Sequence, residues 1–168
     1  MRAEDSAKMP PLRRADRALS AEQALKILES GEVGVLATAD AAGNPLATPL
    51  NYVYWNGAIY FHCAPAGHKL ENLRVNARVS FCVIGASKVL PEALSTAYRS
   101  VIVQGHASLV TGDEKRQALA ALLRKFGNPG AASGDECLGD SIDRTAVVRI
   151  SMDHFCGKGA HLEALPKE

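Results

Sequence analysis

The residues of this chain best placed for chemistry are two adjacent basic side chains, His68 and Lys69, which follow the turn Pro65–Gly67. The pattern around them predicts a strand that ends near Cys63, a tight turn, and a helix that begins at about His68. The start of a helix carries partial positive charge and free N–H donors, so a cation gains nothing there unless an anion joins it. Phosphate is the usual anion at such a place. The alternative is that both side chains simply point into water.

Composition places the chain among ordinary soluble proteins with one domain. Its 168 residues are 47% hydrophobic and 22% charged, and the formal net charge is +1. This balance creates no overall field that would attract nucleic acid or an acidic membrane surface. No segment is long and apolar enough for a signal peptide or a membrane span. We therefore expect neither a nucleic-acid partner nor membrane association.

The cysteines indicate a reducing compartment. Cys63, Cys82, Cys137 and Cys156 form no C-x-x-C pair. The first two fall inside expected strands, where a reduced cysteine behaves as a small apolar residue. We therefore expect no disulfide framework and a cytoplasmic location.

The expected order of elements is rich in strands, with helices on its flanks. Helices are expected from the capping box Ser20–Gln23 to Gly31, from about His68, and from a second capping box, Thr111–Glu114, through the apolar stripe Leu119–Phe126. The pattern predicts strands over residues 33–39, 45–54, 58–63, 77–84, 98–110 and about 144–154. An Asn56-Gly57 hairpin turn joins the second strand to the third, a loop covers 85–97, and a polar tail follows the last strand.

These six strands predict a mainly β fold, an antiparallel β-barrel with flanking helices. Parallel pairing would need helical crossovers, and most of the connections are too short for that. A small barrel is filled by its own side chains, so a sizeable ligand should lie outside it or between subunits, which favours a dimer. We divide the chain into an N-terminal arm (1–19), the barrel domain (20–155) and a C-terminal tail (156–168).

Short motifs in a fixed order resemble those of the FMN-binding split-barrel superfamily, to which pyridoxamine 5′-phosphate oxidase belongs. In chain order they are Val35–Thr38, Asn44–Leu46, Pro49–Tyr54, Ile59–His62, Gly67–Lys69, Asn76–Phe81, Tyr98–Val103, Gly105 and Thr145–Ile150, with Gly157–Lys158 near the end. Within the superfamily the chain looks most like the NimA group of nitroimidazole-resistance proteins. The resemblance implies a six-stranded split barrel that forms a homodimer, with one FMN in each of two grooves between the subunits.

The resemblance also implies which residues hold the cofactor. Lys69 matches the lysine that binds the FMN phosphate, and His68 stands where the oxidases often have arginine. The other matches lie on a strand beside the flavin ring (Pro49, Leu50 and Asn51), on its neighbour, which contacts the ring and ribityl chain (Phe61, His62 and Cys63), and on a segment that reaches the flavin from the partner subunit (Arg99 and Ser100).

The role of His62 can be interpreted in two ways. It shares one face of its strand with Tyr60, so it is either a hydrogen-bonded, half-buried structural residue or a lining residue of the acceptor pocket. Together with His68 and His106 it fits no metal-ligand spacing, and we expect no metal site. The C-terminal residues 157–168 lack the Arg-Leu pair followed by proline that marks the substrate-phosphate site of true pyridoxamine phosphate oxidases. Pyridoxine synthesis is therefore not expected.

Three functions remain open. The first is an FMN-dependent oxidoreductase that passes hydride or electrons, with NAD(P)H as a possible donor, to a small acceptor such as a nitro compound or quinone. The second is a flavin-binding module without catalysis, a sensor or a store. The third is a haem-binding or haem-degrading barrel with His62, His106 or His154 as axial ligand. The chain has no Gly-x-Gly-x-x-Gly segment, so a nicotinamide would visit the flavin cleft.

Overall fold

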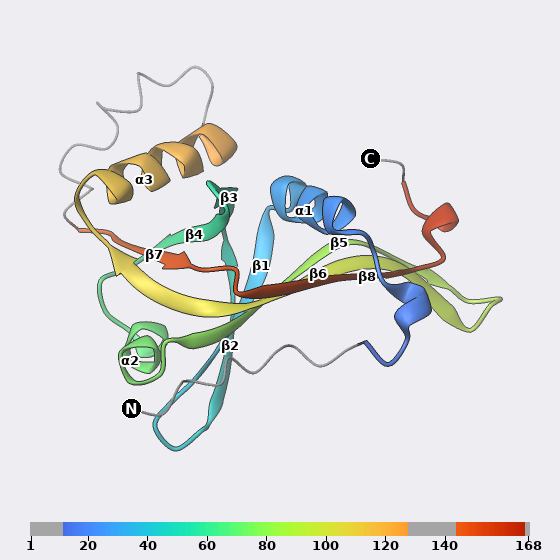
Figure 1. The fold of residues 1–168 in the computed structure, drawn as a ribbon, viewed down its shortest axis with the longest axis horizontal. Coiled ribbons are helices and arrows are strands. Elements are labelled where there is room, and N and C mark those ends of the chain that lie inside the picture. The colour runs from blue at the N-terminus through green and yellow to red at the C-terminus, as the bar shows by residue number, and fades with distance from the viewer. Residues whose placement is uncertain (1–11, 128–143, 167–168) are drawn as a thin grey trace.

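Antiparallel strands make up most of the structure, and helices pack around them (Figure 1). The computed structural model describes residues 12–127 and 144–166; Cys137 and most of the expected N-terminal arm lie outside these ranges. The helices are η1 (Ala15–Arg17), α1 (Ala21–Ser30), α2 (His68–Val75), α3 (Gly112–Phe126) and η2 (Leu162–Ala164). The strands are β1 (Val33–Ala39), β2 (Pro45–Asn51), β3 (Val53–Trp55), β4 (Ala58–Cys63), β5 (Arg78–Leu90), β6 (Ser95–Val110), β7 (Ala146–Ile150) and β8 (His154–Ala160).

The strands form one sheet that curls back on itself. Its order is β2-β1-β5-β6-β7-β4-β3, and β8 pairs with the first part of β6. The two ends of this path, β2 and β3, are separated in the chain by Tyr52 alone. Every strand pair is antiparallel. The predicted mainly β, antiparallel split barrel with flanking helices is confirmed.

The predicted count of six strands is wrong, because residues 12–127 and 144–166 already form eight. The strand expected over 45–54 divides at Tyr52, whose side chain turns into the core and donates its hydroxyl to the Leu28 carbonyl oxygen at 2.8 Å. The strand expected over 144–154 divides into β7 and β8. Residues 154–160 therefore pair with β6 instead of forming the polar tail that the sequence predicts after residue 154.

The prediction of a loop over residues 85–97 is also wrong. β5 and β6 pair as far as Leu90 and Ser95, with a register shift between Ile84 and Ala86, and they project as a long hairpin. Most side chains between 85 and 94 are exposed, so this stretch lacks the alternation of buried and exposed residues that marks a strand in sequence.

Two hydrophobic cores hold the elements together. The larger one fills the space between the inner face of the sheet and α1, and it includes the aligned residues Leu36, Phe81 and Val103, all fully buried. The smaller one lies under α3 and includes Leu122 and Val147. The two cores place α1 and α3 on different parts of the sheet (Figure 1).

Only one of the two predicted capping boxes forms. At α1 the Ser20 hydroxyl accepts from the Gln23 N–H at 3.2 Å, and the Gln23 side chain accepts from the Ser20 N–H at 2.9 Å. At α3 the Thr111 side chain makes no capping hydrogen bond. Glu114 instead accepts the hydroxyl proton of Tyr60 at 2.9 Å, so a tertiary partner replaces the local one.

The outer face of the sheet carries an apolar row that no described element covers. Cross-strand register aligns five residues of this row on β2, β1, β5, β6 and β8: Pro49, Val35, Cys82, Ile102 and Cys156. Ile102 is 40% exposed, and the neighbouring Ile84 and Val33 are 65% and 51% exposed. Large apolar side chains aligned and exposed on one face are typical of an interaction surface.

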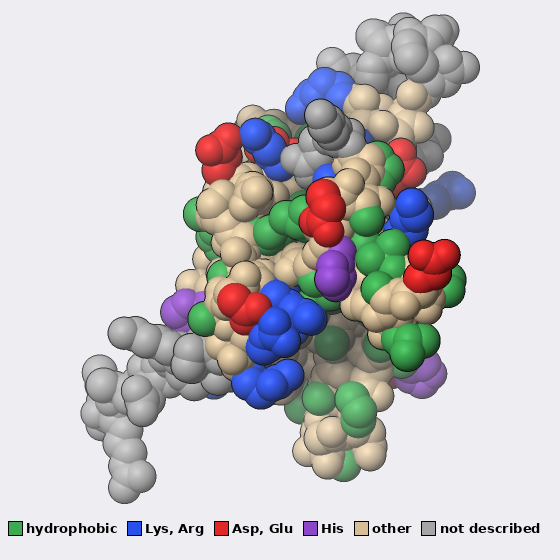
Figure 2. Space-filling model, turned by 90° about the vertical axis from the view of Figure 1, so that its right-hand side faces the viewer, with side chains coloured by type: hydrophobic (Ala, Val, Ile, Leu, Met, Phe, Trp, Pro, Cys, Tyr) green, Lys and Arg blue, Asp and Glu red, His purple; other side chains and the backbone are tan. Residues whose placement is uncertain are grey.

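Charge on the surface is mixed in sign. Figure 2 looks at the end of the molecule from which the β5–β6 hairpin projects, and it shows basic and acidic side chains interspersed with hydrophobic ones. This distribution agrees with the net charge of +1. Among the described residues no helix has both the length and the apolar character needed to cross a membrane.

Candidate functional site

The turn between β4 and α2 leads into a helix start with backbone N–H groups that could hold an anion. α2 begins at His68, as predicted, and Gly67 precedes it with φ 129° and ψ 163°, a conformation that in practice only glycine adopts. The N–H groups of Leu70 and Glu71 bond back to the Gly67 oxygen at 2.9 and 3.1 Å. Within the described residues the N–H groups of His68 and Lys69 have no such partner, so they are available to a ligand.

Lys69 adds a positive charge to this turn. Its side chain is half-buried and has no ion-pair partner among residues 12–127 and 144–166. Burial raises the pKa of the Cys63 thiol and the Lys69 charge opposes that rise, so the ammonium lies near the end of β4. A half-buried cation beside two free N–H groups fits an anionic group such as phosphate. His68 behaves differently: its side chain is 90% exposed and lies 3.3 Å from the Glu71 carboxylate.

The three candidate residues of β4 face different environments. Phe61 is fully buried in the larger core, so only its backbone is open to a ligand. Cys63 is half-buried and packs against the same core. His62 is exposed on the opposite face, in register with Val147 of β7. As predicted, His62 shares that face with Tyr60.

The candidate residues of β2 divide in the same way. Leu50 packs against the core, whereas Pro49 and Asn51 are exposed on the outer face. The Asn51 amide donates to the Glu32 carbonyl oxygen at 3.1 Å. β1 lies beside β2 and also contacts α2 through the buried hydrogen bond from Asn72 to Thr38, 3.0 Å long. The structure thus places β2 and the Lys69 turn next to the same strand.

Arg99 and Ser100 lie elsewhere. They are adjacent on β6 and therefore point to opposite faces. Ser100 is on the outer face, and its hydroxyl lies 3.5 Å from the Lys158 carbonyl oxygen. Arg99 lies on the α1 side and donates to the Pro166 carbonyl oxygen at 3.2 Å. Ser100 is about 20 Å along β6 from His106, the residue that pairs with Arg78 near the end of α2. One chain does not bring these two residues to Lys69.

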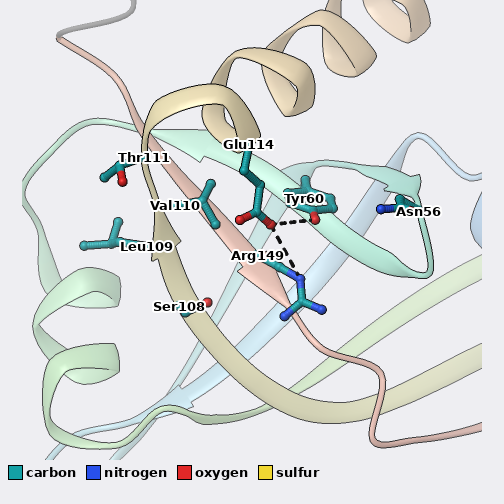
Figure 3. A pocket seen from close by; sticks show the side chains of 8 residues that line it. All are labelled: Asn56, Tyr60, Ser108, Leu109, Val110, Thr111, Glu114 and Arg149. Atoms are coloured by element: carbon teal, nitrogen blue, oxygen red, sulfur yellow. Dashed lines mark hydrogen bonds and ion pairs between the residues drawn. The ribbon is translucent and has the colours of Figure 1, made fainter.

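A pocket of about 440 Å³ lies between β4, the end of β6, β7 and the start of α3, on the face of β4 that also carries His62 (Figure 3). Its lining residues are Asn56, Tyr60, Ser108, Leu109, Val110, Thr111, Glu114 and Arg149. None of them is a site residue predicted from the sequence. The sequence does single out one of them, Glu114, as the carboxylate of the predicted capping box after Thr111. In the structure this carboxylate instead accepts a hydrogen bond from Tyr60 in the pocket.

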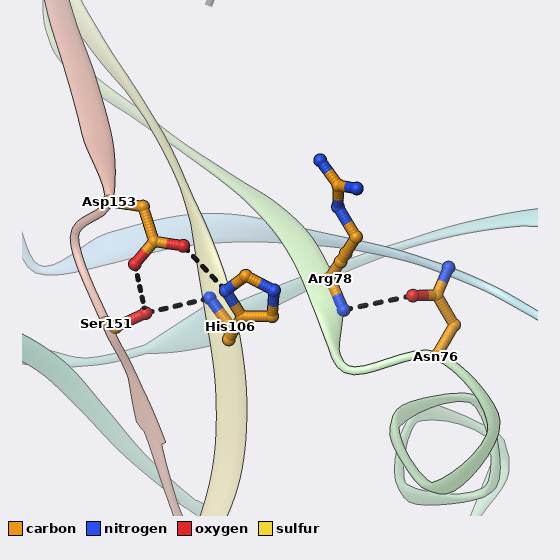
Figure 4. A network of polar contacts seen from close by, with 5 residues as sticks. All are labelled: Asn76, Arg78, His106, Ser151 and Asp153. Carbon is orange, nitrogen blue, oxygen red and sulfur yellow. Dashed lines mark hydrogen bonds and ion pairs between the residues drawn. The ribbon is translucent and has the colours of Figure 1, made fainter. Parts of the chain in front are cut away.

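A second polar cluster joins the β7–β8 link to the bend of β6 (Figure 4). The Ser151 hydroxyl donates to Asp153 at 2.7 Å and accepts from the His106 backbone N–H at 2.9 Å. The His106 Nδ1 lies 2.6 Å from the other Asp153 oxygen. The carboxylate therefore stands between serine and histidine, and the imidazole is not placed to take the serine proton. The cluster is a structural clamp, and the described residues hold no group of three potential metal ligands.

Replacing Asp153 with asparagine should weaken this clamp in a pH-dependent way. The Ser151 hydroxyl, with His106, holds the pKa of Asp153 below its ordinary value of 3.8. A lowered carboxyl pKa stabilises the fold above that ordinary value, and the stabilisation is lost as pH falls through the lower folded value. We expect D153N to lose about 0.5–1 kcal/mol of unfolding free energy at pH 7 and much less at pH 3, measured by urea denaturation. E29Q, at an exposed carboxylate, is the control, and an equal loss at both pH values would contradict the assignment.

Comparison with known proteins agrees with this architecture. Three solved structures illustrate the fold: a candidate 5-nitroimidazole antibiotic resistance protein from Bacteroides thetaiotaomicron (23% identity, 84% of this chain and 85% of that one, TM-score 0.69), an FAD-binding protein from Mesorhizobium loti (26%, 86% and 97%, 0.63), and an FAD and haem binding protein from Mycobacterium smegmatis (19%, 89% and 74%, 0.70).

The sequence gives the family assignment. A comparison with curated protein sequences finds no match. The family model described as pyridoxamine 5′-phosphate oxidase, however, matches residues 20–159, which run from the cap of α1 almost to the end of β8. With an antiparallel split barrel and a match over most of its length, the chain belongs to the pyridoxamine 5′-phosphate oxidase family, whose fold is the flavin-binding split barrel.

Proposed function

We propose that the protein binds FMN in a homodimer and acts as an oxidoreductase toward a small acceptor such as a nitro compound or quinone. The observation that carries the cofactor assignment is Lys69. It is a half-buried cation without a counter-charge among the described residues, and it stands beside the two free N–H groups at the start of α2. A terminal phosphate would neutralise the ammonium and satisfy both donors.

The other candidate residues suit contacts to the rest of the cofactor. The exposed edges of Pro49 and Asn51 and the backbone of Phe61 offer an apolar wall with a few polar groups, the kind of lining that a flavin ring requires. When bound, the flavin supplies the hydride and electron transfer, while the chain positions it and limits water access. The exposed His62 is a polar group available to an acceptor at the edge of this wall.

FMN is favoured over the other cofactors by the size of the anion site. One lysine and two N–H groups suit a single terminal phosphate, whereas FAD carries a diphosphate with an adenosine beyond it. Two of the similar structures are nevertheless named for FAD, and one of these also for haem. A haem alternative requires His62, His106 or His154 as axial ligand. The absorption spectrum of the purified protein distinguishes the two cofactors: a flavin gives a two-band spectrum, and haem gives an intense Soret band.

The homodimer is supported by the outer face of the sheet. The apolar row from Pro49 to Cys156 crosses five strands, and Ile102, on the fourth of them, is exposed. Ser100 and Asn51 lie on the same face, one register row away. A second copy seated on this face would cover the row and bring its own β6 toward the first copy's β2. The composite site would then contain Pro49–Asn51 and Phe61–Cys63 of one chain and Arg99 and Ser100 of the other.

The phosphate assignment predicts a selective loss in the variant K69M. Its affinity for FMN should fall about ten- to a hundred-fold, because a charge-assisted contact is worth about 1.5–3 kcal/mol. Riboflavin has no phosphate, so its affinity should be the same in wild type and variant. Flavin fluorescence titration measures both, and K115M, at a lysine of α3 that is half-buried like Lys69, is the matched control. Unchanged FMN affinity in folded K69M would rule out the assignment.

The dimer assignment predicts that I102K is monomeric. A lysine within the apolar row would place a charge in the interface, so light scattering at micromolar concentration should give a dimer mass for wild type and a monomer mass for the variant. The variant should also lose flavin. L109K is the control, because Leu109 is 52% exposed on the same strand but lines the pocket. A monomeric wild type that still holds flavin would disprove the composite site.

The activity is tested by mixing the FMN-loaded protein with NADH or NADPH without oxygen. We expect slow bleaching of the flavin, followed by reoxidation with a nitroaromatic compound or a quinone. H62A should change turnover more than FMN affinity, whereas H161A, at an exposed histidine beyond β8, should change neither. If dithionite bleaches the flavin and neither nicotinamide does, the protein is a flavin-binding module without this catalysis.

A further inference from the structure

The pocket beside β4 has a buried polar floor and charged walls (Figure 3). Tyr60 forms the floor: its side chain is only 2% exposed, and its hydroxyl donates to Glu114 Oε1 at 2.9 Å. Glu114 comes from the first turn of α3, and Arg149 comes from β7. Three elements that are distant in sequence thus bring a phenol, a carboxylate and a guanidinium together.

Glu114 and Arg149, the two charged residues of the pocket, keep part of their hydrogen-bonding capacity for a ligand. Arg149 Nε lies 3.7 Å from the same Glu114 oxygen that Tyr60 contacts, so both neighbours engage Oε1. Among the described residues no hydrogen bond or ion pair reaches Glu114 Oε2. The side chains of Arg149 and Glu114 are 39% and 45% exposed, and Figure 3 shows the guanidinium directed away from α3. An open carboxylate oxygen and an open guanidinium edge therefore border one cavity.

Neutral donors and acceptors extend the cavity around the pair. Ser108 faces Arg149 across the β6–β7 ladder, so its hydroxyl lies on the same wall as the guanidinium. Asn56, at the tip of the β3–β4 hairpin, adds an amide at the other side. The pocket holds one negative and one positive side chain, 3.7 Å apart, so a ligand with a single charge is attracted by one of them and repelled by the other. A ligand that carries both charges would satisfy both.

We propose that this pocket binds a small zwitterion of the α-amino acid class. The carboxylate of the ligand lies against the Arg149 guanidinium and the Ser108 hydroxyl, and its ammonium lies against Glu114 Oε2. The volume of about 440 Å³ leaves room for a side chain, with Leu109 and Val110 as the apolar part of the lining. The site is complete in one chain and shares no residue with the proposed flavin site, so it does not depend on that function.

Trp55 provides a direct signal for binding. It is the only tryptophan of the chain, and its ring lies 5.5 Å from that of Tyr60, centroid to centroid. Tryptophan emission should therefore respond when the floor of the pocket is covered. The probes are the twenty L-amino acids, titrated one by one into the full-length protein. For any that binds, the amine without the carboxylate and the carboxylic acid without the ammonium are titrated as matched analogues.

We expect at least one amino acid to change the emission saturably, and each of its two analogues to bind at least about tenfold more weakly. R149Q and E114Q should each lower the affinity for that amino acid by at least about tenfold. K115Q, at the residue after Glu114 on α3, should leave this affinity unchanged. S108A tests the carboxylate wall with little risk to folding. The absence of a saturable response to all twenty amino acids overturns the proposal, and so does an analogue that binds as well as the amino acid.

Discussion

Strand β6 is the element on which the rest of the structure depends. Residues 98–104 pair with β8 and residues 107–110 pair with β7, so the strand passes between two parts of the sheet at Gly105 and His106. A Cβ atom on Gly105 would lie 1.7 Å from the Ser151 carbonyl oxygen. No larger residue fits without moving β6 away from the β7–β8 link. The Ser151–Asp153–His106 cluster secures that contact with side-chain hydrogen bonds.

The length of β6 separates two candidate sites. Its first part carries Ser100 on the outer face of the sheet, and its last part carries Ser108 beside the pocket. Because the strand is rigidly paired along both parts, Ser100 cannot reach the Lys69 turn of its own chain. A flavin site that uses Ser100 must therefore be shared between two chains, whereas the pocket needs only one.

Short-range patterns in the sequence predict much of this fold, and long-range contacts explain what they miss. The Ser20–Gln23 box and the helix start at His68 depend on neighbouring residues, and both form as predicted. The Thr111–Glu114 box has the same spacing, but Glu114 bonds Tyr60, 54 residues away. The break at Tyr52 likewise depends on a distant carbonyl group, that of Leu28. Among the site residues, the position of His68 and Lys69 at a helix start had a local signal, and the others were predicted by resemblance. The pocket has no short-range signature.

The two sites have one electrostatic feature in common: a weak acid that burial keeps neutral beside a cation. Burial raises the pKa of Cys63, so at neutral pH its thiol does not serve as a counter-ion for Lys69. Burial, with a smaller contribution from Glu114, likewise raises the pKa of Tyr60, so Glu114 and Arg149 remain the charged groups of the pocket. In each place the neutral group supplies shape and hydrogen bonding without neutralising the cation. The two cations differ in their partners: Lys69 has no counter-charge among the described residues, whereas Arg149 has Glu114 at 3.7 Å. An anionic group therefore suits the Lys69 turn, and a ligand with both charges suits the pocket.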